Sequence, residues 1–182
     1  VSLLVNTFRR SQGARVVTRA PRETIGGLLL DIGGPIDFPS VEHFEASEWF
    51  AFGAGGSEGD KLPISSSSDK FASVFFDLIE KNVNPATLKP RRLLQCSDEE
   101  RILSVLGGRN RVQIHLAHLH MFLRLRADKT DVFLCYIASK RGVIWSVDVS
   151  YNFGRQAWDI DPVLAKSTVM LDVHRVLSPA EL

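Results

Sequence analysis

Three of the five histidines stand within six residues, in the run IHLAHLHMFLRLR of residues 114–126. On a β-strand, side chains two residues apart point to the same side, so His118 and His120 could present two nitrogens to one divalent metal ion. Arg124 and Arg126 would follow on that side and could bind phosphate. The segment therefore suggests a site for a divalent metal ion beside two cations that could bind an anion.

The run HLHMFL, residues 118–123, resembles the histidine-hydrophobic-histidine strand of the HUH replication-initiator and relaxase nucleases. In that family the histidines hold a metal that polarises the scissile phosphate, and a tyrosine near a lysine is the nucleophile. The resemblance implies that His118 and His120 are ligands, Tyr136 the nucleophile and Lys140 an accessory cation. It covers about six residues, and Tyr136 lies in the strand-like run DVFLCYIAS, whereas the family carries its tyrosine on a helix.

The same segment also has a purely structural interpretation, which needs no cofactor and which we favour. Leu119, Met121, Leu123 and Leu125 would face the core, and the opposite, polar face would be half exposed, with its histidines in ordinary hydrogen bonds. The apolar phase changes near Ala117, which predicts a bulge or a break in the strand.

Further potential ligands stand in VEHFEASEW, where the fold would have to bring them near His118. Most often such residues form a solvated acidic face. They are Glu42, His43, Glu45 and Glu48.

Charge is segregated along the chain, although the net charge is only +1. Residues 1–22 form a basic N-terminal segment without an acid, residues 23–80 hold eleven acids against two lysines, and residues 81–182 are basic again. Residues 1–22 could be a transit peptide or a structured element with a solvated basic face, and we favour the structured element. Alternatively, they form an arm that contacts an anionic partner, such as nucleic acid or an anionic surface. The candidate contacts are Arg9, Arg10, Arg15, Arg19, Arg124 and Arg126.

Length and composition favour one globular domain spanning residues 1–182, with 45% hydrophobic and 24% charged residues. No apolar run approaches the roughly 18 residues of a membrane-spanning helix, so we expect a soluble chain without a transmembrane segment. Cys96 and Cys135 lack metal-ligand spacing and lie in apolar contexts. We interpret them as reduced core residues in a reducing, cytoplasmic compartment, and a disulfide between them is the less favoured alternative.

The periodicity predicts an α+β fold: a C-terminal antiparallel β-meander, two central helices packed on it, and additional N-terminal strands. Residues 53–69 form a long Gly/Ser-rich loop. A helix is expected over residues 69–82, and a second one after the capping box of Ser97 and Glu100, ending at Gly107 and Gly108. The expected strands cover residues 24–32, 47–52, 111–126, 132–138, 143–151, 156–161 and 168–177.

Three classes of function remain open. The first, which we favour, is a non-enzymatic binding or assembly module that engages a partner protein, a second copy of itself or an anionic partner. The second, which the resemblance implies, is a metal-dependent phosphodiester nuclease of HUH-like type that uses His118 and His120 to hold a divalent metal such as Mn²⁺ or Mg²⁺. The third is a small-molecule binding domain with a pocket between the two helices and the sheet.

Overall fold

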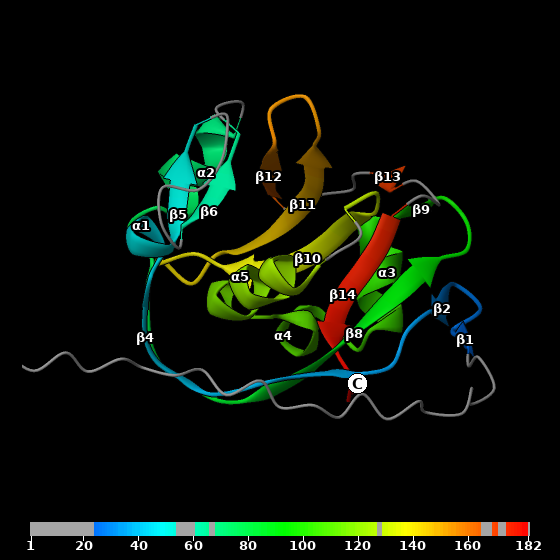
Figure 1. Cartoon of the computed structure of the whole chain (residues 1–182). Coiled ribbons are helices and arrows are strands. Elements are labelled where there is room, and N and C mark those ends of the chain that lie inside the picture. Colours follow the sequence, from blue (N-terminus) through cyan, green and yellow to red (C-terminus); the bar gives the residue numbers. More distant parts are fainter. Residues whose placement is uncertain are drawn as a thin grey trace, which may run out of the picture.

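The computed structural model describes residues 24–53, 61–65, 68–126, 129–164, 169–170 and 174–181 (Figure 1). It has many strands and a few helices, which confirms the broad α+β class. The expected antiparallel meander is correct only for part of the main sheet, because that sheet is mixed. The basic segment of residues 1–22 lies outside the described residues.

The main sheet follows the order β1-β2-β8-β14-β10-β11-β12-β6-β5, and β3 pairs with β8 beside this path. Neighbours pair in antiparallel fashion except β10 with β14, β12 with β6, and β5 with β6, which are parallel. Its strands are β1 Thr24–Ile25, β2 Leu29–Asp31, β3 Ile36–Phe38, β5 Phe50–Phe52, β6 Leu62–Ile64, β8 Ala86–Leu93, β10 Val132–Ala138, β11 Ile144–Asn152, β12 Ala157–Leu164 and β14 His174–Pro179.

Two short ribbons and five helices complete the described fold. One ribbon pairs β4 (Val41–Glu45) with β7 (Ile79–Val83), and the other pairs β9 (Ser97–Asp98) with β13 (Val169–Met170). The helices are α1 Ala46–Trp49, α2 Asp69–Phe75, α3 Glu99–Val105, α4 Arg109–Val112 and α5 Leu116–Leu125. Within the described ranges, no helix has the length and apolar character needed to cross a membrane.

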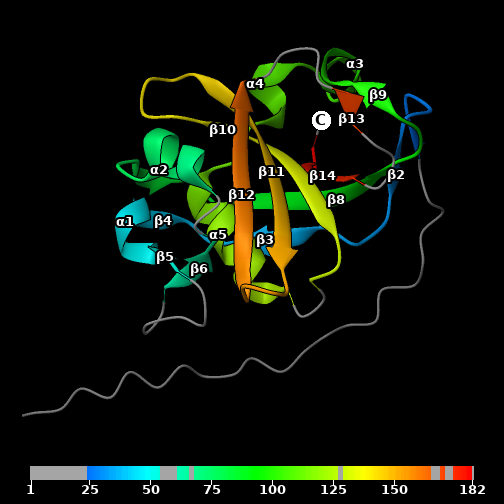
Figure 2. The same ribbon diagram turned by 90° about the horizontal axis from the view of Figure 1, so that it is seen from above.

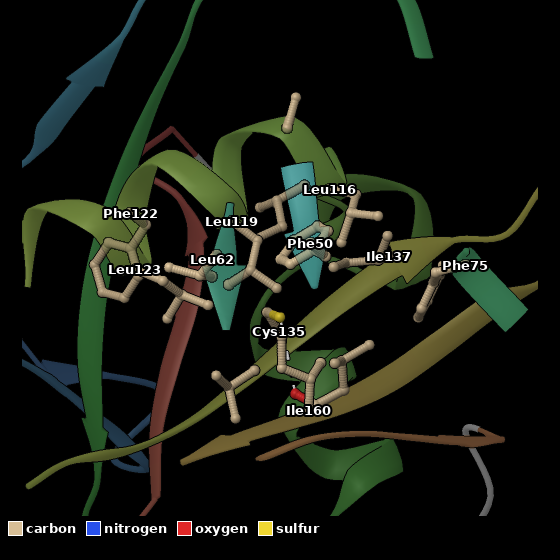
Figure 3. Close-up of a cluster of buried hydrophobic side chains, with 14 of the residues drawn as sticks. Phe50, Leu62, Phe75, Leu116, Leu119, Phe122, Leu123, Cys135, Ile137 and Ile160 are labelled. Atoms are coloured by element: carbon tan, nitrogen blue, oxygen red, sulfur yellow. Dashed lines mark hydrogen bonds between the residues drawn. The ribbon is translucent and has the colours of Figure 1, made fainter. Parts of the chain in front are cut away.

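Strand β10 lies in the middle of the sheet and is buried on both faces, as its uninterrupted apolar run predicts. Phe133, Cys135 and Ile137 join the larger core, where α2 and α5 pack on the sheet (Figure 3). Leu134 and Tyr136 join a second core on the opposite face, under α3 and α4. Each fully buried large apolar side chain contributes roughly 1.5 to 3 kcal/mol to folding.

Helix α3 confirms the second predicted helix, with its cap moved by one residue. The carboxylate of Asp98, rather than the hydroxyl of Ser97, accepts the hydrogen bond from the Arg101 N–H at 2.7 Å. The helix ends where Gly107 and Gly108 adopt φ angles of 85° and 95°, a region that favours glycine.

Several elements differ from the sequence expectations because strand pairing overrides local periodicity. The helix expected over residues 69–82 ends at Phe75, and residues 79–83 instead pair with β4 as β7. Residues 46–49 form α1 before β5, and a turn at Gly26 and Gly27 divides the first expected strand into β1 and β2. Strand β6 lies within the expected long loop, of which residues 54–60 and 66–67 are outside the described part.

The largest error concerns residues 111–126, which form α4 and α5 rather than a strand. The phase change near Ala117 marks the start of α5, not a bulge. Cys96 is also exposed rather than in the core, whereas Cys135 is buried as expected, and both are free thiols.

Strand β8 was not expected, since its sequence ATLKPRRL contains proline and three cations. It is stabilised by a buried guanidinium. Arg91 is 1% exposed, lies 3.2 Å from Asp31 on β2, and donates to the Ser178 hydroxyl and to the Pro179 carbonyl on β14. Arg91 therefore connects three neighbouring strands of the sheet.

Candidate functional site

A groove of about 570 Å³ opens between the C-terminal end of α2 and the turn that joins β10 to β11. Figure 2 shows this turn beside α2. The groove lies within the size range of ligand-binding clefts. Asp77 lines it on the helix side, Lys140 and Arg141 on the turn side, and Val74, Val143 and Trp145 provide apolar surface.

The turn is held in a defined shape by its own backbone. The Ser139 N–H donates to the Val143 carbonyl at 2.8 Å, and the Gly142 N–H donates to the Ser139 carbonyl at 2.8 Å. Gly142 has a φ of 74°, which a residue with a side chain adopts only under strain. Lys140 and Arg141 therefore stand exposed at the tip of a fixed hairpin.

The opposite wall is fixed by the buried face of α2. Phe71 and Phe75 are both fully buried in the larger core, and the Leu78 N–H donates to the Phe75 carbonyl at 2.8 Å. Asp77 is the exposed residue between these two anchors. Core packing therefore fixes the backbone position of Asp77 along the groove.

The charged groups of the groove are not neutralised by the described part of the chain. Asp77, Lys140 and Arg141 form no side-chain hydrogen bond or ion pair with another described residue. The indole Nε1–H of Trp145 is shielded from solvent and also lacks a hydrogen-bond partner among those residues. The groove thus combines apolar surface, two cations and one carboxylate that are available to a ligand.

His118 and His120, the two predicted metal ligands, lie on helix α5 and are packed in different surroundings. In an α-helix, residues two apart point about 200° from each other. His118 packs against Phe38, with ring centroids 5.8 Å apart, and is 1% exposed. The fold therefore does not place the His118 and His120 nitrogens side by side as a strand would.

His120 is enclosed by aromatic rings. Its ring centroid lies 5.7 Å from that of Phe44, 5.3 Å from Trp49 and 5.4 Å from Phe50. Burial, together with a smaller effect of the positive charge of Arg124, lowers the pKa of His120 to about 4. His120 is therefore a neutral core side chain at pH 7. Burial also lowers the pKa of His118, with repulsion from His115 as a smaller cause.

The third histidine, His115, lies at the start of α5, where Glu80 from another element caps the helix. One carboxylate oxygen of Glu80, on β7, accepts hydrogen bonds from His115 Nδ1 at 3.0 Å and from the Leu116 N–H at 3.1 Å. The other oxygen accepts from the Ala117 N–H at 2.8 Å. An acceptor at this position satisfies the free N–H groups of a helix start. The hydrogen bond to Glu80 raises the pKa of His115.

The arginines predicted to bind an anion take different positions. Arg126 lies 2.6 Å from the Asp131 carboxylate, which Arg175 also contacts, and its guanidinium stands 5.0 Å from the Phe133 ring centroid. Arg124 is exposed near the end of α5. Arg9, Arg10, Arg15 and Arg19 lie outside the described residues.

Tyr136 lies on β10, not on a helix, and is fully buried. Burial raises the pKa of its hydroxyl, and the negative charge of Glu99 adds to this effect. A hydroxyl in this state is a poor nucleophile. Lys140 lies at the exposed tip of the turn, so the tyrosine and lysine of the run CYIASK are in unlike environments.

Among the described residues, one group of three potential ligands could hold a metal ion: His43, Glu45 and Glu48, whose donor atoms lie within 4.8 Å of one another. Two of the three are exposed, and Lys81 stands opposite His43 on β7. Phe44, on the other side of β4, packs on His120, so these ligands do not join the histidines of α5. Exposed groups of this kind are common without a metal, and we assign no function to them.

Sequence reasoning missed Asp77, Arg141 and Trp145 as site residues. The two cations between the predicted strands were visible as a basic hairpin tip, which is a local signal. Asp77 joins them only through the packing of α2 beside the sheet.

The chain was compared with models of protein families, with curated proteins and with solved structures, and none of these searches found a match.

Proposed function

We propose that the protein is a non-enzymatic binding module and that the groove between α2 and the β10–β11 turn receives the negatively charged group of its partner. The proposal rests on one observation. Lys140 and Arg141 stand together at the edge of this groove and make no ion pair with the described residues. An anion bound there would gain two charge-assisted contacts beside an apolar surface.

The environments of the other candidate groups support binding rather than catalysis. His118 and His120 are buried in separate aromatic surroundings, and the Tyr136 hydroxyl has a raised pKa. Arg126 already holds Asp131, so it has less to offer a phosphate. The groove has groups of the right type at an accessible position.

The test uses 1-anilinonaphthalene-8-sulfonate, an anionic aromatic dye that fluoresces in apolar surroundings. We expect saturable binding to the folded protein, with energy transfer from tryptophan. Replacing both cations, as Lys140→Gln with Arg141→Gln, should weaken binding at least tenfold.

A matched control replaces two cations that are exposed elsewhere, as Lys81→Gln with Arg92→Gln, and should leave the dissociation constant unchanged. Both double variants lose the same net charge, so a general electrostatic effect would weaken binding equally in the two. Equal weakening, or binding that persists without Lys140 and Arg141, would contradict the proposed site.

A further inference from the structure

The groove carries charges of both signs on different elements, and Val74, Val143 and Trp145 are also part of its lining. Lys140 and Arg141 belong to the β10–β11 turn, whereas Asp77 belongs to the opposite wall. None of the three forms an ion pair with the described residues, so no direct ion pair joins the two walls. A ligand with a single negative group would use the cations and leave Asp77 as a repulsive neighbour.

We propose that the groove binds an amino acid with an apolar side chain, in its zwitterionic form. Its carboxylate would lie against Lys140 and Arg141, its ammonium against Asp77, and its side chain on the apolar surface. This inference rests on the proposed function, which it extends by naming the ligand class.

The position of Asp77 fits recognition better than it fits stability. The residue follows the C-terminal end of α2, where the free carbonyl groups carry partial negative charge and favour a cation. An acid at this place gains nothing from the helix. A bound ammonium would provide the missing partner.

The apolar surface gives the ligand side chain a contact. Val74 and Trp145 both pack against the larger core, and Val143 is exposed on the turn. The apolar surface is therefore held in place at Val74 and Trp145 and open to solvent at Val143. A volume of about 570 Å³ accommodates a small molecule of this kind.

The experiment is isothermal titration calorimetry with three matched ligands: L-phenylalanine, N-acetyl-L-phenylalanine and L-phenylalaninamide. The second lacks the ammonium and the third lacks the carboxylate, while the side chain is constant. We expect the unmodified amino acid to bind at least tenfold more tightly than either derivative.

Variants then assign each end of the ligand to one wall. With Asp77→Asn, L-phenylalanine and its N-acetyl derivative should bind equally, because the protein then lacks the carboxylate that favours the ligand ammonium. With Lys140→Gln and Arg141→Gln, L-phenylalanine and its amide should bind equally. Such loss of selectivity measures the coupling between ligand group and residue.

The results separate this inference from the proposed function. If the sulfonate dye binds at Lys140 and Arg141 but N-acetyl-L-phenylalanine binds as tightly as L-phenylalanine, the groove selects anions and the zwitterion proposal is wrong. If neither the dye nor any of the three ligands binds, both proposals fail. If selectivity persists in Asp77→Asn, the ammonium site is elsewhere and the inference is overturned.

Discussion

Helix α5 and the groove at the β10–β11 turn use polar residues in opposite ways. On α5, His118 and His120 are almost completely buried, and Glu80 accepts hydrogen bonds from two backbone N–H groups at the start of the helix. At the groove, the charged side chains are exposed and have no partners among the described residues. In this protein, therefore, the histidines, which are the residue type most associated with chemistry, are part of the core, while exposed surface charges line the groove.

The largest effect is expected at the buried histidine. His120→Ala should remove a ring that contacts three aromatic side chains and should lower the free energy of unfolding by about 2 to 4 kcal/mol, as other large-to-small core changes do. His120→Phe keeps an aromatic ring but adds volume, so it should cost about 1 to 3 kcal/mol through overpacking. Urea unfolding at pH 7 measures both values.

The exposed histidine of β4 provides the control, since His43→Ala should change stability by no more than about 0.5 kcal/mol. If His120→Ala costs no more than His43→Ala, His120 does not act as a core residue and the contrast between the two regions fails.

A smaller effect is expected from pH. The folded-state pKa of His120 is about 4, below the ordinary value of 6.5, so its neutral form contributes stability that is present above about pH 6.5. This contribution is lost as the pH falls towards 4. Between pH 7 and pH 5 it amounts to roughly 2 kcal/mol, at 1.36 kcal/mol for each unit below 6.5.

The comparison with His120→Phe isolates this contribution. His115, whose pKa is raised, changes in the opposite direction, because its protonated form contributes stability that is lost as the pH rises through its folded pKa. His115 is present in both proteins, so its contribution cancels in the comparison. The wild type should therefore lose about 2 kcal/mol more than His120→Phe on acidification, and equal losses would show that His120 titrates normally.

The sequence predicts the C-terminal strands best, because β10 and β11 carry their own signals. An apolar run on both faces marks β10, and alternation marks β11. Residues 116–125 were predicted as a strand although they form a helix. Because α5 is buried on nearly all sides, its sequence lacks the polar stripe by which an amphipathic helix is recognised. The alternation of His118, His120 and Phe122 with leucine then imitates a strand.

The cap and the groove depend on contacts between distant segments. Glu80 lies 36 residues before Leu116, whose N–H it accepts, so no local pattern reveals that α5 starts there. Asp77 and Arg141 come together only when α2 packs beside the hairpin. Local propensity cannot predict either arrangement, because each is decided by tertiary packing.

The smallest change in stability is expected at the groove, where Asp77→Asn removes an exposed carboxylate without a partner among the described residues. Loss of an unfavourable charge at the end of α2 and loss of weak attraction to Lys140 and Arg141 act in opposite directions. The free energy of unfolding should therefore change by less than about 0.5 kcal/mol, measured by urea unfolding at pH 7. The same substitution should abolish the preference for L-phenylalanine over its N-acetyl derivative. A loss above 1 kcal/mol would instead give Asp77 a structural role, and the groove would then resemble α5 in using its polar groups for folding.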